Sequence, residues 1–329
     1  MTERGATWAL VLAAGSGSRL EMLTTTASGQ TIPKQFCSLQ GGPALIHEAL
    51  QRAAAVCKPA QICTVVAEQH RIWWRPSLAQ LPESNVIVQP QNRGTANGVL
   101  WPLLHILERD PDAVVVLLPS DHHVDNEELL AAALRQAIDQ ARLCSDAVVL
   151  LGMEPEEADA ELGYILPQQP GSREGSAVAH FAEKPAALYA QQLIEAGALW
   201  NTFIVAARAQ SLLMLFKSRC PELVLQMQAF KWELASSPPG ELSLHDLYDR
   251  LPELDFSHHI LVGRESRLRV LAVPRCGWND LGTPRRVTET LRRQPRLAQM
   301  RDLIVEAAHL NLAAQCERLS VVPGIVPVS

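Results

Sequence analysis

The first residues that could do chemistry lie in a glycine-rich segment, residues 10–36, with the sequence LVLAAGSGSRLEMLTTTASGQTIPKQF. An apolar run leads into two glycines, and the cations Arg19 and Lys34 follow. A buried strand that ends in such a turn leaves backbone N–H groups free to bind phosphate, and nearby cations strengthen the site. The segment is neither a Walker A loop nor a dinucleotide fingerprint, because Arg19 and Leu20 stand where those motifs need other residues. An ordinary turn is the alternative.

Two carboxylates, Asp121 and Asp280, are candidates for a metal site. Asp121 follows an apolar run in the sequence LLPSDHH, and Asp280 lies in the glycine-flanked sequence CGWNDLG. Mg²⁺ prefers one or two carboxylates together with phosphate oxygens, so carboxylates beside a phosphate loop suit this ion. An Asx turn or a helix N-cap is the alternative for Asp121. We read His122 and His123 as loop residues and not as metal ligands.

Two later motifs carry polar groups that could recognise a sugar or its phosphate. The sequence FAEKP brings Glu183 and Lys184 together, and LWNTF places Asn201 between large apolar residues. A carboxylate accepts hydrogen bonds from hydroxyls, and a lysine pairs with phosphate. A surface salt bridge and a simple turn are the alternative explanations.

Strands and helices that alternate along the first half of the chain would position these groups. Short connections between them predict a doubly wound α/β fold with parallel strands. Ligands bind at the carboxyl ends of such strands, so the clusters GSGSR, QPQNRGTA and PSDHH should converge on one cleft. Beyond residue 152 the pattern predicts a smaller sheet. The predicted strands include residues 62–67, 85–89, 113–118, 147–151, 163–166, 177–182, 199–206 and 269–274, and the predicted helices include 43–56, 95–108, 127–143 and 221–235.

The composition is that of a globular protein. The 329 residues are 47% apolar and 19% charged, and the net charge of −6 argues against a general nucleic-acid binder. The seven cysteines have no zinc-like spacing and suit reduced thiols. No apolar run reaches the roughly 18 residues that span a membrane, and the N-terminus reads as a strand and not as a signal peptide. We therefore expect a cytoplasmic protein with no membrane or nucleic-acid partner.

The order of the motifs resembles that of the sugar-1-phosphate nucleotidyltransferases, and most closely that of the mannose-1-phosphate guanylyltransferases. The resemblance rests on LAAGSGSRL, PKQF, QPQNRGTA, LLPSDHH, ELGYIL, FAEKP, LWNTF, DFS and GWNDLGTP, which run from about residue 8 to residue 286. Any one of these motifs is weak, whereas all of them in this order form a specific pattern.

The resemblance implies a Rossmann-like, doubly wound, mixed but mostly parallel sheet with a smaller sugar-binding β-sheet subregion. It implies that GTP and α-D-mannose 1-phosphate react to give GDP-mannose and pyrophosphate, with Mg²⁺ as cofactor. The implied catalytic residues are Arg19, Lys34 and Asp121, and the implied metal ligands are Asp121 and Asp280. The implied nucleotide site consists of Leu12, Ala13, Ala14, Gly15, Ser16, Gly17, Ser18, Gln89, Asn92, Arg93, Gly94 and Thr95. The implied sugar-phosphate site consists of Gly163, Glu183, Lys184 and Asn201.

Several sequences depart from the family pattern. The chain has no proline soon after Arg19-Leu20, and residues 21–32 form a longer polar segment that we predict to be a mobile lid. RGTAN and WNTFI replace the more usual RNTAP and WNSG. Two alternatives therefore stay open. One is another nucleotidyltransferase, because PKQF also resembles methylerythritol-phosphate cytidylyltransferase, and the other is a catalytically weak homologue that senses nucleotide sugars.

The domain prediction is a catalytic domain at residues 1–285 and a helical and extended tail at residues 286–329. The apolar helix faces at residues 212–216 and 223–230 pack within the chain or form a homodimer.

Overall fold

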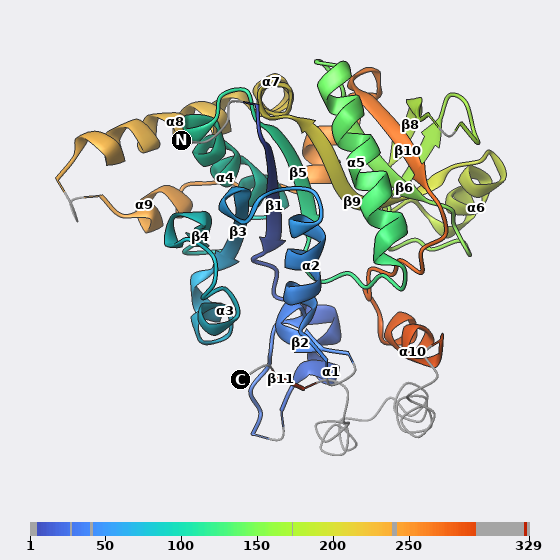
Figure 1. Cartoon of the computed structure of the whole chain (residues 1–329), viewed down its shortest axis with the longest axis horizontal. Helices are drawn as coiled ribbons and strands as arrows, with labels where there is room; N and C mark the ends of the chain where they lie inside the picture. The colour runs from blue at the N-terminus through green and yellow to red at the C-terminus, as the bar shows by residue number, and fades with distance from the viewer. Residues whose placement is uncertain are drawn as a thin grey trace.

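The computed structural model describes residues 5–26, 28–39, 42–172, 174–238, 242–293 and 326–327. A nine-stranded sheet forms the centre of these residues, in the order β4-β3-β1-β5-β9-β6-β10-β8-β7 (Figure 1). Neighbours among β4, β3, β1 and β5 are parallel, as are β6 and β10, whereas β9, β8 and β7 run antiparallel to their neighbours. The α/β prediction is confirmed. The strands are β1 (Thr7–Ala13), β3 (Ile62–Ala67), β4 (Val86–Gln89), β5 (Val114–Pro119), β6 (Val148–Met153), β7 (Tyr164–Pro167), β8 (Ser176–Ala182), β9 (Leu199–Arg208) and β10 (Leu268–Val273).

The smaller sheet expected after residue 152 is continuous with the first one. Strand β9 pairs with β5 and β6 along its length, and its first residues, Leu199 and Trp200, also pair with β7. The strands β9, β6, β10, β8 and β7 therefore close into a ring that shares β9 with the parallel half. The sequence predicted strands in this region but not that they would join a single sheet.

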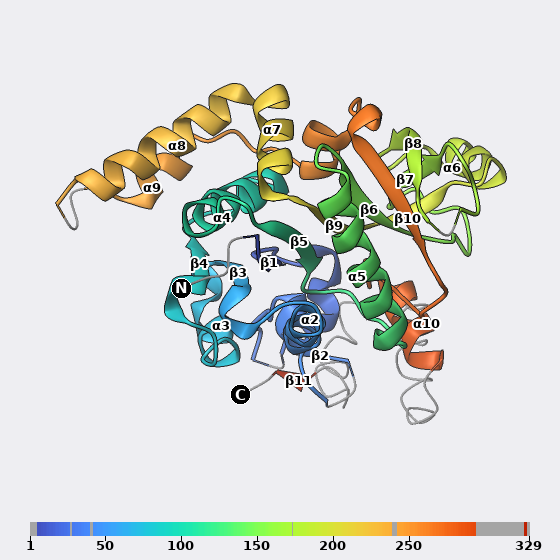
Figure 2. The ribbon, with the colours of Figure 1, turned by 45° about the horizontal axis from the view of Figure 1, so that its top comes forward.

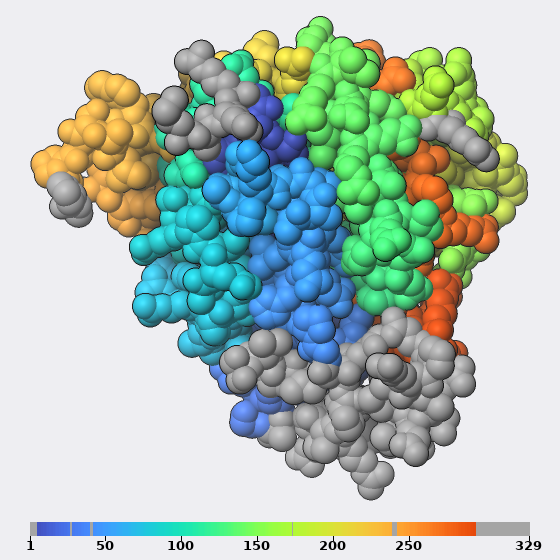
Figure 3. All heavy atoms as spheres, viewed as in Figure 1, coloured from blue at the N-terminus to red at the C-terminus, as the bar shows by residue number. Residues whose placement is uncertain are grey.

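Alternating side chains of β1 face two layers of helices. Trp8 and Leu10 belong to the core that the sheet shares with α4, α7 and α8, and Ala9 and Val11 belong to the core shared with α2 and α5. Figure 2 shows these two layers on opposite sides of β1 and β5, and the space-filling view in Figure 3 shows α2 and α5 side by side on one face. The period of two in side-chain direction along a strand thus produces a three-layer fold.

The helices bury apolar stripes against the sheet. In α5, Leu130, Leu134, Ile138 and Ala141 lie on one face, and the side chain of Asn126 caps the first turn by accepting a hydrogen bond from the backbone of Leu129. The helices are α1 (Glu21–Thr24), α2 (Leu45–Ala54), α3 (Arg71–Ser77), α4 (Thr95–Arg109), α5 (Glu127–Leu143), α6 (Ala187–Glu195), α7 (Ala209–Arg219), α8 (Pro221–Ser236), α9 (Leu244–Tyr248) and α10 (Pro284–Arg293).

The apolar faces of α7 and α8 pack within the chain. Leu212 and Phe216 of α7 and Leu223 and Met227 of α8 are buried in the core. The homodimer stays a prediction.

No helix among the described residues is both long and apolar enough to cross a membrane. Near the end of the chain, β11 (Val326–Pro327) pairs with β2 (Cys37–Ser38). Most of the predicted tail, residues 294–325, lies outside the described residues.

Candidate active site

A cleft with a volume of about 430 Å³ lies at the carboxyl ends of β1, β4 and β5, where the fold is expected to bind its ligand. The parallel half of the sheet and the ring of strands both contribute to its walls. The predicted site residues that line it are Leu12, Ala14, Gly15, Gly17, Arg19, Gln89, Asn92, Gly94, Thr95, Asp121, Gly163, Glu183, Lys184, Asn201 and Asp280.

The glycine loop after β1 is held by the PKQF segment. Gly17 has a φ of +66°, and a Cβ atom there would lie 3.0 Å from the Cβ of Lys34, so glycine suits this position in both conformation and space. The side-chain amide of Gln35 donates hydrogen bonds to the carbonyl oxygens of Ala13 and Gly15, each at 2.9 Å. With these carbonyls bound, the loop can offer its N–H groups to an anion.

Lys34 is a buried cation that joins three segments. Its Nζ lies 2.9 Å from Oδ2 of Asp121 and donates to the carbonyl oxygen of Asp280 at 2.6 Å. The Lys34 side chain is 8% exposed, compared with 36% for Asp121. Burial by itself would raise the pKa of Asp121, but several interactions, chief among them the charge of Lys34, together hold this pKa below its usual value. Asp121 is therefore ionised at neutral pH.

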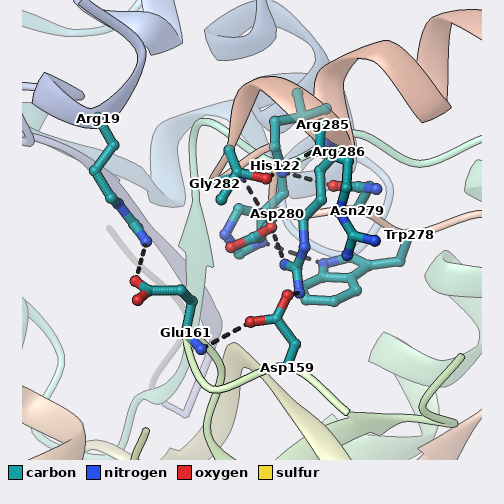
Figure 4. Close-up of polar contacts among 12 residues, drawn as sticks. Arg19, His122, Asp159, Glu161, Trp278, Asn279, Asp280, Gly282, Arg285 and Arg286 are labelled. Carbon is teal, nitrogen blue, oxygen red and sulfur yellow. Dashed lines mark hydrogen bonds and ion pairs between the residues drawn. The ribbon is translucent and has the colours of Figure 1, made fainter. Parts of the chain in front are cut away.

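Asp280 is held by a second buried cation, Arg286 of α10 (Figure 4). One guanidinium nitrogen of Arg286 donates to Oδ1 of Asp280 and another donates to Oδ2 of Asp159. The side chain of Arg286 is 6% exposed. Burial would raise the pKa of Asp280, but Arg286 lowers it below its usual value. Each of the two predicted metal ligands thus has its own buried cation.

His122 also lines the cleft, with its Nε2 3.7 Å from Oδ1 of Asp121. The indole N–H of Trp278 donates to Nδ1 of His122 at 3.2 Å, and the two rings meet edge to face. This contact assigns the imidazole proton to Nε2. Burial lowers the pKa of His122 to about 4, so the ring is neutral at pH 7.

The segment after β4 packs closely against residues 252–256. A Cβ atom at Gly94, whose φ is +84°, would lie 2.3 Å from the carbonyl oxygen of Leu254, so this backbone contact requires glycine. The hydroxyl of Thr95 lies 3.1 Å from Oδ2 of Asp255 and accepts a hydrogen bond from the backbone of Phe256. The side chain of Gln89 is buried, lines the cleft and lies beside the buried hydroxyl of Tyr248.

Glu183, Gly163 and Asn201 form the other wall. The backbone N–H of Asn201 donates to the carbonyl oxygen of Gly163 at 2.8 Å, and a Cβ atom at Gly163 would lie 2.6 Å from Oε2 of Glu183. Burial, and then the nearby Asp255, raise the pKa of Glu183 to about 7. In the described part of the chain Oε2 of Glu183 is buried without a hydrogen bond, so it can accept one from a ligand hydroxyl.

The family model for nucleotidyl transferases matches residues 8–294. The chain belongs to the nucleotidyl transferase family. The family was predicted correctly from the order of the motifs. The xanthan biosynthesis protein XanB of Xanthomonas campestris pv. campestris (strain B100) is 29% identical over 280 residues, which are 83% of this chain and 57% of that protein. The mannose-1-phosphate guanylyltransferase of Escherichia coli (strain K12) is 28% identical over 289 residues, which again cover 83% of this chain and 57% of that protein.

This nucleotidyl transferase chain spans a little more than half the length of those curated relatives. A solved structure described as a mannose-1-phosphate geranyltransferase from Thermus thermophilus is 26% identical, with a TM-score of 0.75 over 88% of this chain and 80% of that chain. The fold, the sequence family and the motif order therefore agree.

Some predicted site residues of the nucleotidyl transferase do not line the cleft. Lys34 lies outside the lining, with its Nζ paired to Oδ2 of Asp121, and the guanidinium of Arg93 donates to the carbonyl oxygen of Tyr248 at 2.8 Å. The other predicted residues outside the lining are Ala13, Ser16 and Ser18.

Other residues that contribute to the site were not predicted. Oε2 of Glu161 lies 3.0 Å from Nη1 of Arg19 and links the glycine loop to the loop before β7 (Figure 4). Glu161 lies in the motif ELGYIL and Gln35 lies in the motif PKQF, so both could have been predicted as site residues from those motifs. Arg286 lies in the predicted tail and had no such signal.

Proposed function

We propose that the chain is a sugar-1-phosphate nucleotidyltransferase that converts GTP and α-D-mannose 1-phosphate into GDP-mannose and pyrophosphate. One observation carries the proposal: a single cleft joins a glycine loop backed by the Lys34–Asp121 pair with a wall made by Glu183 and Asn201. The names of the relatives in Escherichia coli and in Salmonella typhimurium, both mannose-1-phosphate guanylyltransferases, support this choice of nucleotide and sugar.

In this reaction an oxygen of the sugar 1-phosphate attacks the α-phosphorus of the triphosphate in line. A new P–O bond forms, the bond to the β-phosphate oxygen breaks, and pyrophosphate leaves with the electron pair. The attacking phosphate is already an anion at pH 7, so it needs no protein base. Catalysis then consists of positioning the reactants and stabilising charge.

The residues take their roles from their places in the cleft. The glycine loop binds the nucleotide phosphates, and Arg19 with the buried Lys34 stabilises their charge. The segment from Gln89 to Thr95 faces the base and ribose. On the opposite wall Glu183 accepts hydrogen bonds from hydroxyls of the hexose, and the side-chain amide of Asn201 forms hydrogen bonds with it. Lys184 pairs with the phosphate of the sugar.

We further propose that Asp121 and Asp280 hold Mg²⁺. Both side chains line the cleft, and lowered pKa values keep both ionised, as ligands of a hard cation must be. The described residues contain no group of three or more His, Cys, Asp or Glu side chains that could hold a metal ion, so phosphate oxygens and water would complete its shell. The bound ion would supply positive charge to the phosphate oxygens.

Pyrophosphate release tests the proposal. The purified protein is incubated with Mg²⁺, mannose 1-phosphate and each of ATP, GTP, CTP, UTP and dTTP, and we expect the fastest release with GTP. A separate reaction contains Mg²⁺, CTP and methylerythritol phosphate. Asp121→Asn serves as the inactive control. No release with any nucleotide would contradict the proposal and favour the nucleotide-sugar sensor, whereas release with CTP and methylerythritol phosphate would favour the cytidylyltransferase.

A further inference from the structure

Arg286 engages one carboxylate oxygen of Asp280 and leaves the other free. Oδ1 of Asp280 accepts hydrogen bonds from the guanidinium of Arg286 and from the backbone N–H of Gly282, the latter at 3.0 Å. Oδ2 accepts no hydrogen bond within the described ranges of the chain. Asp280 lines the cleft, so a cation that binds there would meet Oδ2.

The guanidinium of Arg286 is fixed in this place. It also pairs with Asp159, and its carbon lies 5.5 Å from the centre of the Trp200 ring. Asp159 is itself held, because its Oδ1 accepts a hydrogen bond from the backbone N–H of Glu161 at 2.7 Å (Figure 4). The Arg286 side chain is thus 6% exposed and is held by a carboxylate on each side.

The charges around the two carboxylates are almost balanced. Asp121, Asp280 and Asp159 carry three negative charges, and Lys34 and Arg286 carry two positive charges, which leaves one net negative charge. Two unpaired carboxylates would attract a divalent cation more strongly than this cluster does.

We propose that Arg286 is a positioning residue that acts as the resident counter-ion of Asp280 and opposes the binding of a free divalent cation. The cation then enters as a complex with the nucleotide, whose phosphates bring the missing negative charge. This inference rests on the proposed function, because it assigns Asp280 to the metal.

Coulomb's law gives the size of the repulsion at low ionic strength. A divalent cation on Oδ2 would lie roughly 6 Å from the guanidinium, and even with the dielectric constant of bulk water this repulsion corresponds to about tenfold in affinity. The effect grows in the partly buried cleft, where water screens the charges less.

Titration with Mn²⁺ alone, followed by the electron paramagnetic resonance signal of the free ion, tests this inference without any turnover. We expect Arg286→Met to bind Mn²⁺ at least about tenfold more tightly than the unmodified protein. Arg285→Met is the matched control, because Arg285 is the neighbouring residue of α10 and pairs with the exposed Glu157. Its affinity should match that of the unmodified protein.

A purely structural role for Arg286 predicts the opposite result. If Arg286 only held Asp280 in place, Arg286→Met would bind Mn²⁺ equally or more weakly, and that outcome overturns the inference. Arg286→Lys keeps the charge but cannot bridge both carboxylates, so we expect its Mn²⁺ affinity to stay within about threefold of the unmodified protein.

A double variant keeps the test decisive if the single variant does not fold. Removing Arg286 alone leaves Asp159 as an unpaired buried charge, which destabilises a protein. Arg286→Met with Asp159→Asn removes both charges, and we expect it to bind Mn²⁺ more tightly than the unmodified protein because the nearer cation has gone. If the unmodified protein releases pyrophosphate but the double variant binds Mn²⁺ no more tightly than it does, this inference alone is overturned. If the double variant binds Mn²⁺ more tightly but the unmodified protein releases no pyrophosphate, only the proposed reaction is overturned.

Discussion

Replacing Glu183 by Gln should remove a pH dependence from the stability of this protein. Burial and the neighbouring Asp255 raise the pKa of Glu183 from 4.5 to about 7. Between these values the folded state keeps a proton that the unfolded state has lost, so unfolding releases a proton and a rise in pH favours unfolding. The stabilisation is complete below the lower value and is lost as the pH rises toward the upper one.

The size of the effect follows from the two pKa values. Each pH unit between them is worth about 1.4 kcal/mol, which gives a ceiling of about 3.5 kcal/mol for the whole titration. Glu183 is partly exposed, so solvent screening reduces this, and we expect about 2 kcal/mol between pH 5 and pH 8.

Urea denaturation at pH 5, 6, 7 and 8 measures the effect. The free energy of unfolding of the unmodified protein, relative to that of Glu183→Gln, should fall by about 2 kcal/mol across this range. Glu253→Gln is the control for the loss of a carboxylate from the same cleft, because Glu253 lines the cleft but is exposed. A constant difference between the unmodified protein and Glu183→Gln would refute the reasoning.

Three further predictions concern the cleft and the residues that support it. Lys34→Met should lower turnover by on the order of 10²–10³ in the pyrophosphate assay, since it removes the buried cation that pairs with Asp121, and near-normal turnover would count against that role. Gly94→Ala should reduce the free energy of unfolding by at least about 2 kcal/mol, because its Cβ would meet the carbonyl of Leu254. Gly29→Ala, at a φ of +80° with open space around it, controls for backbone strain alone, and equal losses would show that the contact does not matter. Glu161→Gln removes an ion pair between half-exposed side chains, so we expect less than about fivefold change in the KM for the nucleotide and no change in kcat; a large fall in kcat would show that the pair does more than bridge the cleft.

Much of the fold was predictable from local patterns. The strand predicted at residues 62–67 and the helix predicted at residues 127–143 have the observed bounds, because each has a continuous apolar run or a clear helical stripe. The three polar clusters after the strands do converge on one cleft, as the carboxyl ends of parallel strands require.

The remaining features depend on long-range contacts. Nζ of Lys34 donates to the carbonyl of Asp280, 246 residues away, and Arg286 donates to Asp159, 127 residues away. No local pattern in the sequence could predict contacts over such separations. Local periodicity in the sequence likewise could not predict that β9 lies between β5 and β6. The segment at residues 21–32, predicted to be a mobile lid, contains α1 and a bridge between Thr25 and Thr31, and its mobility stays a prediction. The cytoplasmic location and the domain boundary at residue 285 also stay predictions.

Strand β9 has a consequence for how the two substrates could meet. It carries Asn201 near its start and pairs with β5, the strand that leads to Asp121, farther along. The two halves of the cleft are thus built on one continuous hydrogen-bonded sheet, and the backbone of β9 sets the distance between the proposed sugar site and the proposed nucleotide site. Side chains on either wall can change to accept another sugar or another base while this spacing, on which in-line transfer depends, remains the same.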